Sequence, residues 1–502
     1  ATWYLEDGDI TVIANENGQS VKQGSNSAVA DSDTVITQRD SEKATDNTIT
    51  VSTTDDTTAN ITIEDVNINS YGDAIDVGSS GANITLEGDN KLNSEYGSGL
   101  HVSDGDVTIT GSGSLEAGSK NDSNNNAAIG SHENEAMSGD ITIGGDAQVT
   151  AVSRDDGAGI GSGDMGEMSG DITIGDNAQV TAWSETGGAG IGSGRESNMS
   201  GNITIGGSAQ VTAGSNSETA GIGSGNNGVF TSTGRVVIRD SAKVTAIGEN
   251  EGAGIGTGED ELMAGMIIIQ DNAQVTAIAG DRAAAIGSDN LDEMTGTIII
   301  IGNARVTTGI LDDDVYFDYN TKEIKYTLDE NATGYIGDSK YSNHESDEGH
   351  YIIGPDVTIN GISGSDIEAL KDYINMRLSG ENHDGEPENL TKLDVRSENG
   401  EFTVTAEGEG AVEKILYGGS ENVPTAPGTY PVTCVVRIGE ETIEFQIDTY
   451  VVPEPAPQPE PMAHHTRIQL YRVADKQGRS IAYKAVQKGG VLTITTDEKE
   501  AK

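Results

Sequence analysis

Residues 157–182 read Gly-Ala-Gly-Ile-Gly-Ser-Gly, then the acidic loop Asp-Met-Gly-Glu-Met, then Ser-Gly-Asp-Ile-Thr-Ile-Gly and Asp-Asn-Ala-Gln-Val-Thr-Ala. The same cassette recurs along residues 129–306. Its glycine-flanked isoleucines are spaced 31, 31, 31, 33 and 31 residues apart, at Ile129, Ile160, Ile191, Ile222, Ile255 and Ile286. A fixed period of this size is typical of a solenoid, in which each repeat buries its apolar side against its neighbours.

The period is shorter before this stretch. The segments 61–63, 84–86 and 107–109 have the same Ile/Val-Thr-Ile/Leu character and begin 23 residues apart. A coil of that length suits three short strands joined by three turns, which predicts an all-β fold, a right-handed parallel β-helix. The 31-residue repeats keep the three strands and lengthen one turn. We therefore expect the long loops to project from one side of the helix.

Alternation along each strand predicts which side chains face outward. In the segment 148–151 the valine and alanine point inward, whereas glutamine and threonine point outward. Stacking the repeats then gives two exposed polar ladders. One ladder contains Thr150, Thr181, Thr212, Thr245, Thr276 and Thr307. The other contains Gln148, Gln179, Gln210, Lys243, Gln274 and Arg305.

The remaining sequence indicates further parts around the solenoid. We expect an N-terminal cap with irregular coils at 1–60, the β-helix at 61–364 and a helix with a connector at 365–390. An immunoglobulin-like β-sandwich is expected at 391–452 and a Pro-rich linker at 453–463. The basic segment 464–502 suits a β-hairpin belonging to a further stalk module. The chain starts at Ala1 without a basic, apolar leader, so any export signal or anchor is expected outside these residues.

Charge and composition narrow the possible partners. The 502 residues carry a net charge of −53, which repels phosphate backbones and argues against nucleic-acid binding. No apolar run of the length that spans a bilayer occurs, so membrane insertion is not expected. The single cysteine, Cys434, excludes an intrachain disulfide framework. No cofactor is expected, although the acidic loops are rich enough in oxygen ligands for calcium. A monomer is expected.

Aromatic residues are few, which makes them candidates for a binding surface. Alternation points Trp183 outward, where an exposed indole beside polar ladders suits a sugar-binding face. The alternative is that Trp183 lies under a neighbouring long loop or the expected helix. Tyr316 and Tyr319, in the acidic insertion 312–330, form a second candidate contact surface, again with packing as the alternative.

Catalysis has weaker support in the sequence. A polysaccharide lyase needs a base and a cation to steady an enolate, but the Arg and Lys residues of the repeats do not recur at one coil position. A glycoside hydrolase needs an isolated carboxylate pair, and here carboxylates occur throughout. We therefore expect no enzyme, and we keep polysaccharide lyase or glycoside hydrolase as an alternative.

The repeat motifs carry a resemblance to a known group of proteins. With Gly-Asp-Ile-Thr-Ile-Gly, Ala-Gln-Val-Thr-Ala and Gly-Ala-Gly-Ile-Gly-Ser-Gly, the chain resembles large surface proteins of Gram-positive gut bacteria whose repeats form a right-handed parallel β-helix. The stretch Pro-Gly-Thr-Tyr at 427–430 is similar to immunoglobulin-like stalk modules that follow such heads. Together the similar segments cover about residues 45–452.

The resemblance implies a function and a location. Related β-helices are often labelled carbohydrate-binding, so the chain is expected to be a non-catalytic adhesin, secreted or attached to the bacterial cell wall. Its expected partner is a host or dietary glycan, or a host surface glycoprotein, bound through the exterior of the helix. A protein-binding adhesin that uses the long loops remains an alternative.

Overall fold

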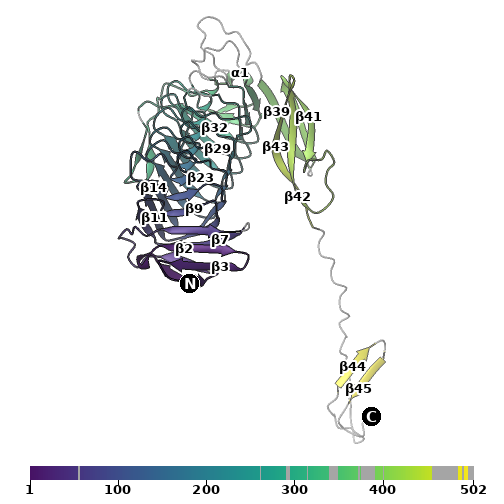
Figure 1. Cartoon of the computed structure of the whole chain (residues 1–502). Coiled ribbons are helices and arrows are strands. Elements are labelled where there is room, and N and C mark those ends of the chain that lie inside the picture. Colours follow the sequence, from purple (N-terminus) through teal and green to yellow (C-terminus); the bar gives the residue numbers. More distant parts are fainter. Residues whose placement is uncertain are drawn as a thin grey trace.

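The computed structural model describes residues 1–54, 57–259, 262–289, 294–313, 315–338, 349–370, 373–374, 390–398, 401–454, 484–488 and 491–495. Nearly all regular structure is β, and parallel strands stack along the axis of a long solenoid (Figure 1). This confirms the predicted all-β class and its stacked parallel sheets. Among the described residues, no helix has the length and apolar character needed to cross a membrane.

Three long sheets form the sides of the solenoid, and from β7 to β37 each coil contributes one strand to each sheet. Sheet 1 contains β1 (Thr2–Tyr4), β5 (Thr34–Thr37), β7 (Thr58–Glu64), β10 (Gly81–Glu87), β13 (Val107–Gly111), β16 (Ile141–Ile143), β19 (Ile172–Ile174), β22 (Asn202–Ile205), β25 (Arg235–Ile238), β28 (Met266–Ile269), β31 (Thr297–Ile300), β36 (His350–Ile353), β39 (Leu390–Glu398) and β40 (Glu401–Gly408). Sheet 2 contains β4 (Val29–Ala30), β3 (Gly18–Gln23), β2 (Ile10–Asn15), β6 (Ile49–Thr53), β9 (Ile75–Gly78), β12 (Leu100–Val102), β15 (Ile129–Gly130), β18 (Ile160–Gly161), β21 (Ile191–Gly192), β24 (Ile222–Gly223), β27 (Ile255–Gly256), β30 (Ile286–Gly287) and β35 (Ile336–Gly337). Sheet 3 contains β8 (Asn67–Ser70), β11 (Asp89–Ser94), β14 (Ser114–Ser119), β17 (Gln148–Ser153), β20 (Gln179–Ser184), β23 (Gln210–Ser215), β26 (Lys243–Ile247), β29 (Gln274–Ala279), β32 (Arg305–Ile310), β37 (Thr358–Ile359) and β38 (Ile362–Ser363).

Equivalent residues of successive cassettes lie directly over one another. Ile160 pairs with Ile191, and Val180 pairs with Val211, in parallel register. Their side chains are buried in one continuous apolar core that runs along the axis. The glycine after each isoleucine is required by this stacking. At Gly161 the backbone has φ 141°, and an added Cβ would lie 1.7 Å from the carbonyl oxygen of Gly192 in the next coil.

The long turns of the cassettes are stacked as regularly as the strands. Each turn ends in a large apolar residue that forms a parallel bridge with its counterpart in the next coil. These residues are fully buried, and they are Met137, Met168, Met199, Phe230, Met263 and Met294. The long loops therefore share one side of the helix, as predicted, but their inner ends form a further packed layer of its core.

Both ends of the apolar core are covered. At the N-terminal end, β3 and β4 add antiparallel strands to β2, and the 3-10 helix η1 (Leu5–Asp7) inserts the buried Leu5. At the C-terminal end lies the short helix α1 (Ile367–Leu370), and the rest of the predicted helix falls mostly outside the described residues. Leu370 and Ile374 are buried in the solenoid core.

The segment with the predicted immunoglobulin-like sandwich is joined to the solenoid through its first strand. β39 pairs in parallel with β36, and β40 then pairs antiparallel with β39, so both extend sheet 1. The strands β41 (Gly410–Tyr417), β42 (Gly428–Ile438) and β43 (Glu441–Val452) form a separate antiparallel sheet. Its buried face shares one apolar cluster with the outward-facing Ile268, Ile299 and Ile352 of sheet 1. Beyond the linker, whose residues after 454 lie outside the described part, β44 (Lys484–Lys488) and β45 (Val491–Thr495) form a hairpin.

Candidate functional site

The predicted polar ladders lie on the outer face of sheet 3. Gln148, Gln179 and Gln210 are exposed and stacked in register. The neighbouring threonines, Thr150, Thr181 and Thr212, are half-buried and stacked in the same way. This part of the solenoid therefore presents a regular, flat and polar surface.

The prediction that Trp183 forms an exposed sugar-binding surface is wrong. Its side chain points outward, as alternation indicates, but it is 0% exposed. The acidic insertion forms the hairpin β33 (Tyr316–Asp318) and β34 (Glu323–Lys325), which folds back over this column. Trp183 shares a buried cluster with Val152, Ile247, Ile278, Val315, Phe317 and Ile324. Its Nε1 atom has no hydrogen-bond partner among the described residues, so the indole serves here as an apolar side chain.

Polar contacts along its edge hold the hairpin on the solenoid. The Tyr319 ring lies over the guanidinium group of Arg154, with 4.5 Å between the guanidinium carbon and the ring centroid, and its hydroxyl donates a hydrogen bond to Glu185. Lys322 Nζ lies 2.5 Å from Glu116 Oε1. Of the two tyrosines predicted as contacts, Tyr319 is held on the solenoid by these contacts and is 37% exposed, whereas Tyr316 is 56% exposed.

A pair of exposed aromatic rings lies elsewhere, on two of the 23-residue coils. Tyr71 is the first residue after β8 and Tyr96 is the second residue after β11, and the Tyr96 amide donates a hydrogen bond to the Tyr71 carbonyl oxygen. Their ring centroids are 4.8 Å apart and their planes are inclined by 44°. Tyr71 is 72% exposed and Tyr96 is 51% exposed. The sequence interpretation missed this pair, since neither residue belongs to the 31-residue cassette.

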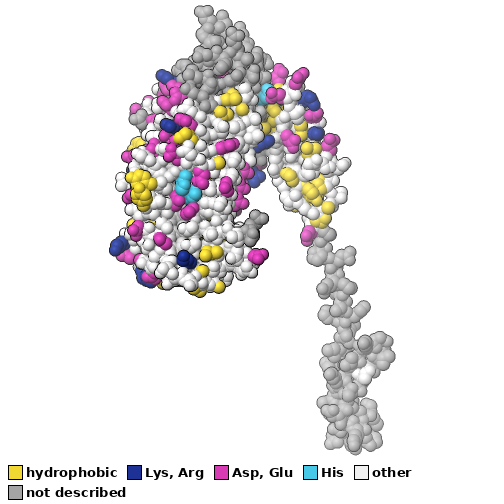
Figure 2. Space-filling view, viewed as in Figure 1, with side chains coloured by type: hydrophobic (Ala, Val, Ile, Leu, Met, Phe, Trp, Pro, Cys, Tyr) yellow, Lys and Arg dark blue, Asp and Glu magenta, His cyan; other side chains and the backbone are white. Residues whose placement is uncertain are grey.

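A cluster of two histidines and three carboxylates lies beside the tyrosines. Asp73 follows Tyr71 by two residues, and its Oδ1 atom lies 2.7 Å from His132 Nε2. His101 lies between two other carboxylates, with Nδ1 2.8 Å from Asp76 Oδ1 and Nε2 2.7 Å from Glu135 Oε2. Figure 2 shows histidine side chains bordered by acidic side chains on this face, with hydrophobic side chains close by. We call these five residues the His–Asp cluster.

The two imidazole rings of the His–Asp cluster are stacked. Their centroids are 3.7 Å apart and their planes differ by 3°. Donor atoms of Asp73, His101 and His132 all lie within 4.8 Å of one another, so these three residues are placed to share one metal ion. Burial alone would lower the pKa of His101, but the hydrogen bonds to Asp76 and Glu135 outweigh burial and raise this pKa to about 9. Burial opposes ionisation of Asp73, yet the hydrogen bond to His132 and its charge hold the Asp73 pKa below its usual value.

The His–Asp cluster interrupts the glycine pattern of the repeat. His101 lies in register with Gly130, in the column where every later cassette carries the glycine of Ile-Gly. His132 follows Ser131 at the position where the next cassettes have Gly163, Gly194 and Gly225. Both exceptions fall where the short coils meet the first long cassette. A comparison of the repeats position by position could therefore have found both histidines.

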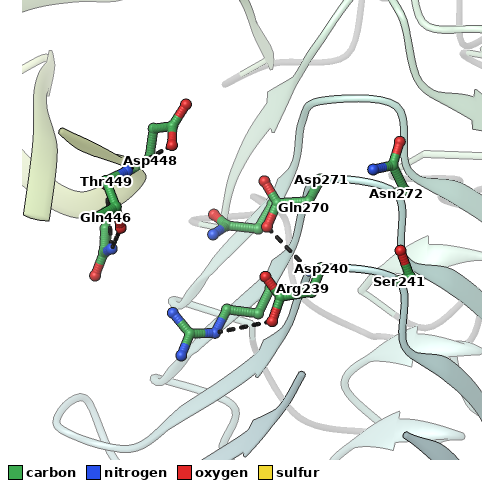
Figure 3. A pocket seen from close by; sticks show the side chains of 9 residues that line it. All are labelled: Arg239, Asp240, Ser241, Gln270, Asp271, Asn272, Gln446, Asp448 and Thr449. Carbon is green, nitrogen blue, oxygen red and sulfur yellow. Dashed lines mark hydrogen bonds and ion pairs between the residues drawn. The ribbon is translucent and has the colours of Figure 1, made fainter. Parts of the chain in front are cut away.

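A polar pocket of about 460 Å³ lies between the solenoid and β43 (Figure 3). Arg239, Asp240, Gln270 and Asp271 approach from two successive turns, and Gln446, Asp448 and Thr449 approach from β43. Burial, with the nearby charges of Asp240 and Asp448, raises the pKa of Asp271. Gln270 is 5% exposed, and its Oε1 atom has no hydrogen-bond partner among the described residues. The pocket is acidic and small, and it lies at the interface between the β41–β43 sheet and the coils of the solenoid.

No protein-family model, curated protein or solved structure matches this chain.

Proposed function

We propose that the protein is a non-catalytic adhesin that binds glycans, of host or dietary origin, through the exterior of its β-helix. The observation that carries the proposal is the exposed Tyr71–Tyr96 pair. Two adjacent aromatic rings without cover are unusual on a surface this polar, where few apolar side chains have to be exposed. Burial of Trp183 moves the expected contact from sheet 3 to these tyrosines.

The tyrosine pair has the properties that sugar recognition requires. The face of an aromatic ring packs against the C–H groups of a pyranose, while the phenolic hydroxyl remains available for hydrogen bonding. Rings inclined by 44° form a shallow, angled surface and not a flat sheet. Such a surface suits a ligand that presents apolar C–H faces and hydroxyl groups side by side.

The neighbouring groups favour a hydroxyl-rich ligand over an anionic one. Asp73 follows Tyr71 by two residues and belongs with Asp76 and Glu135 to the His–Asp cluster, whose carboxylate oxygens can accept hydrogen bonds from sugar hydroxyl groups. The net charge of −53 repels acidic polysaccharides at long range. We therefore propose neutral glycans as the ligand class. We propose that the protein itself is secreted or attached to the surface of the bacterial cell wall.

A glycan array with the full chain tests this function. The double variant Tyr71→Ala/Tyr96→Ala is expected to lose at least about tenfold in affinity for the glycans bound by the wild type, since stacked aromatic contacts are each worth about 0.5–1.5 kcal/mol beyond area burial. Tyr316→Ala is the matched control, because Tyr316 is 56% exposed but lies on the β33–β34 hairpin. It should bind as the wild type does.

Two outcomes would contradict the proposal. Wild-type protein that binds no glycan on the array would exclude the function. Binding that Tyr316→Ala weakens, while the double variant leaves it unchanged, would place the contact on the hairpin and exclude the tyrosine pair.

A further inference from the structure

We propose that the His–Asp cluster is a binding site for a divalent transition-metal ion of the Zn²⁺ class. Asp73, His101 and His132 would ligate the ion, with Asp76 beside them as a further oxygen donor. Glu135 would act as a positioning residue behind the two rings. The proposal uses neither tyrosine of the proposed glycan contact, although it shares the carboxylates of Asp73, Asp76 and Glu135 with it.

The donor atoms face one another on one side of the stacked rings. His101 Nδ1 lies 2.8 Å from Asp76 Oδ1 and 3.8 Å from Asp73 Oδ2, and His132 Nε2 lies 2.7 Å from Asp73 Oδ1. Zinc binds nitrogen and oxygen ligands at about 2.0–2.2 Å, which separates neighbouring ligand atoms by about 3.5 Å. The donors lie within 4.8 Å of one another, and because the two rings are parallel, ligation of one ion requires the rings to turn toward each other until both near nitrogens point at it.

The opposite side of the rings has the support that histidine ligands usually have. Glu135 Oε2 lies 2.7 Å from His101 Nε2 and 3.7 Å from His132 Nδ1, so one carboxylate faces the far nitrogen of both rings. The same oxygen accepts a hydrogen bond from the His132 amide, which holds the carboxylate in place. In this structure Asp76 and Glu135 face the two nitrogens of His101, so each nitrogen donates a hydrogen bond. An ion would take the place of the proton on the near nitrogen, while Glu135 holds the proton on the far nitrogen.

The cluster is rigidly positioned by the backbone. Asp76 and His101 are register partners on β9 and β12, and His132 follows β15 in the next coil. Asp73 Oδ1 also accepts a hydrogen bond from the Ser98 amide. His101 is 7% exposed, whereas the neighbouring carboxylates reach the surface. The site is therefore built on strands and their immediate ends, with an open approach for an ion.

The donor set selects the class of ion. Two imidazole nitrogens with carboxylate oxygens suit Zn²⁺, Ni²⁺ and Cu²⁺, whereas Ca²⁺ and Mg²⁺ prefer sites made of oxygen alone. The net charge of −53 raises the local concentration of any cation. The calcium that the acidic loops suggest from the sequence would therefore be a poor competitor at the His–Asp cluster.

Calorimetric titration of the EDTA-treated full chain with ZnCl₂ tests the site. Since other groups on so acidic a chain also bind Zn²⁺ weakly, the readout is the difference between the wild type and His101→Asn/His132→Gly. Glycine is the residue of the sibling cassettes at position 132, so the double variant should keep its fold, which circular dichroism checks. We expect the wild type to bind one more Zn²⁺ per chain than the double variant does. A hundredfold excess of CaCl₂ should not displace this ion.

Control variants separate ligands from bystanders. His350→Asn removes a histidine that pairs with Glu441 at 3.1 Å outside the cluster, and it should leave binding unchanged. Glu135→Ala should weaken binding about 10–100-fold, and Glu135→Gln, which keeps an acceptor oxygen, should recover part of the loss. In the Co²⁺-loaded wild type, ligand-field absorption in the visible region should appear and be absent from the double variant.

Equal Zn²⁺ stoichiometry in the wild type and the double variant would overturn the proposal. So would displacement of the ion by CaCl₂, since that outcome indicates a site made of carboxylates alone. Neither result would decide the glycan test, because that test compares the wild type with Tyr71→Ala/Tyr96→Ala and does not use the metal-site variants.

Discussion

Ile324 of β34 and Trp183 of β20 meet above Gly214, the residue that follows Trp183 in the outward-facing column. A Cβ added at Gly214 would lie 3.1 Å from Trp183 Cζ3 and 3.2 Å from Ile324 Cδ1. Glycine at this position of the column leaves the space into which the indole and the isoleucine fit. The hairpin and the solenoid surface are therefore complementary in shape, large side chain against small.

Burial of Trp183 predicts its fluorescence. The chain has two tryptophans, so Trp3→Phe leaves Trp183 as the only indole. This variant should emit at short wavelength and resist quenching by acrylamide, since Trp183 is 0% exposed. Ile324→Asp, made in the same background, should shift the emission to longer wavelength by loosening the hairpin. Tyr316→Asp is the control on the same hairpin and should not. Rapid acrylamide quenching in Trp3→Phe itself would contradict the packing.

Removal of the indole should cost stability and should not act through a lost sugar contact. Trp183→Ala leaves a cavity between the hairpin and sheet 3, with an expected loss of about 3–5 kcal/mol in the free energy of unfolding. Tyr316→Ala, at a 56% exposed ring, should change stability by no more than about 0.5 kcal/mol. Urea unfolding followed by circular dichroism measures both. Similar losses in free energy of unfolding in the two variants would show that Trp183 contributes no more to stability than the exposed Tyr316.

The repeat made most of the solenoid predictable. Strand faces followed from alternation because an inner column such as Ile141, Ile172 and Ile203 must remain apolar in every coil. Register followed from the period, since a stacked coil leaves each residue only one partner above and below. The same logic placed Gln148 and Thr150 correctly on the outer face.

The features that the sequence did not predict depend on contacts between residues distant in sequence. Trp183 is covered by residues about 140 positions later, and no local pattern shows that the 312–330 insertion folds back. The His–Asp cluster joins Asp73 to His132 two coils away, although its glycine replacements are visible in the sequence. The packing of β41–β43 on sheet 1 is also indicated in the sequence of β28. Alternation ends at Ile267, Ile268 and Ile269, where both faces of the strand are buried.

The glycine column gives a sharp test of the coil geometry. Gly161→Ala should be severely destabilising, because the residue has φ 141° and the new Cβ would approach the Gly192 carbonyl oxygen to 1.7 Å. Gly175→Ala, in the same cassette, has open space around its Cβ position and should be tolerated to within about 0.5 kcal/mol. Thermal unfolding distinguishes the two. Equal midpoints would show that coils at this point are not stacked in the register described.

Asp164 provides a pH-dependent test of the long turns. Its side chain is 1% exposed, and burial raises its pKa to about 6 despite Arg195, whose Nε atom lies 3.5 Å from Asp164 Oδ1. Because the folded state binds this proton more tightly than the unfolded chain does, the proton's stabilising effect is complete below pH 3.8 and is lost as the pH rises through about 6. Above pH 6 the buried charge therefore destabilises the fold.

The neutral variant Asp164→Asn should consequently be more stable than the wild type at pH 7–8, by about 1–3 kcal/mol, and the gain should disappear near pH 4. A sibling cassette already carries Asn226 at this position, so the amide fits the turn. Asp122→Asn, at a side chain 87% exposed, removes the same charge from the surface and serves as control. Urea midpoints across this pH range would measure the difference. A gain in Asp164→Asn that is constant with pH, or equal to that of the control, would show that the carboxylate at 164 is solvated and that the stacked turn is open.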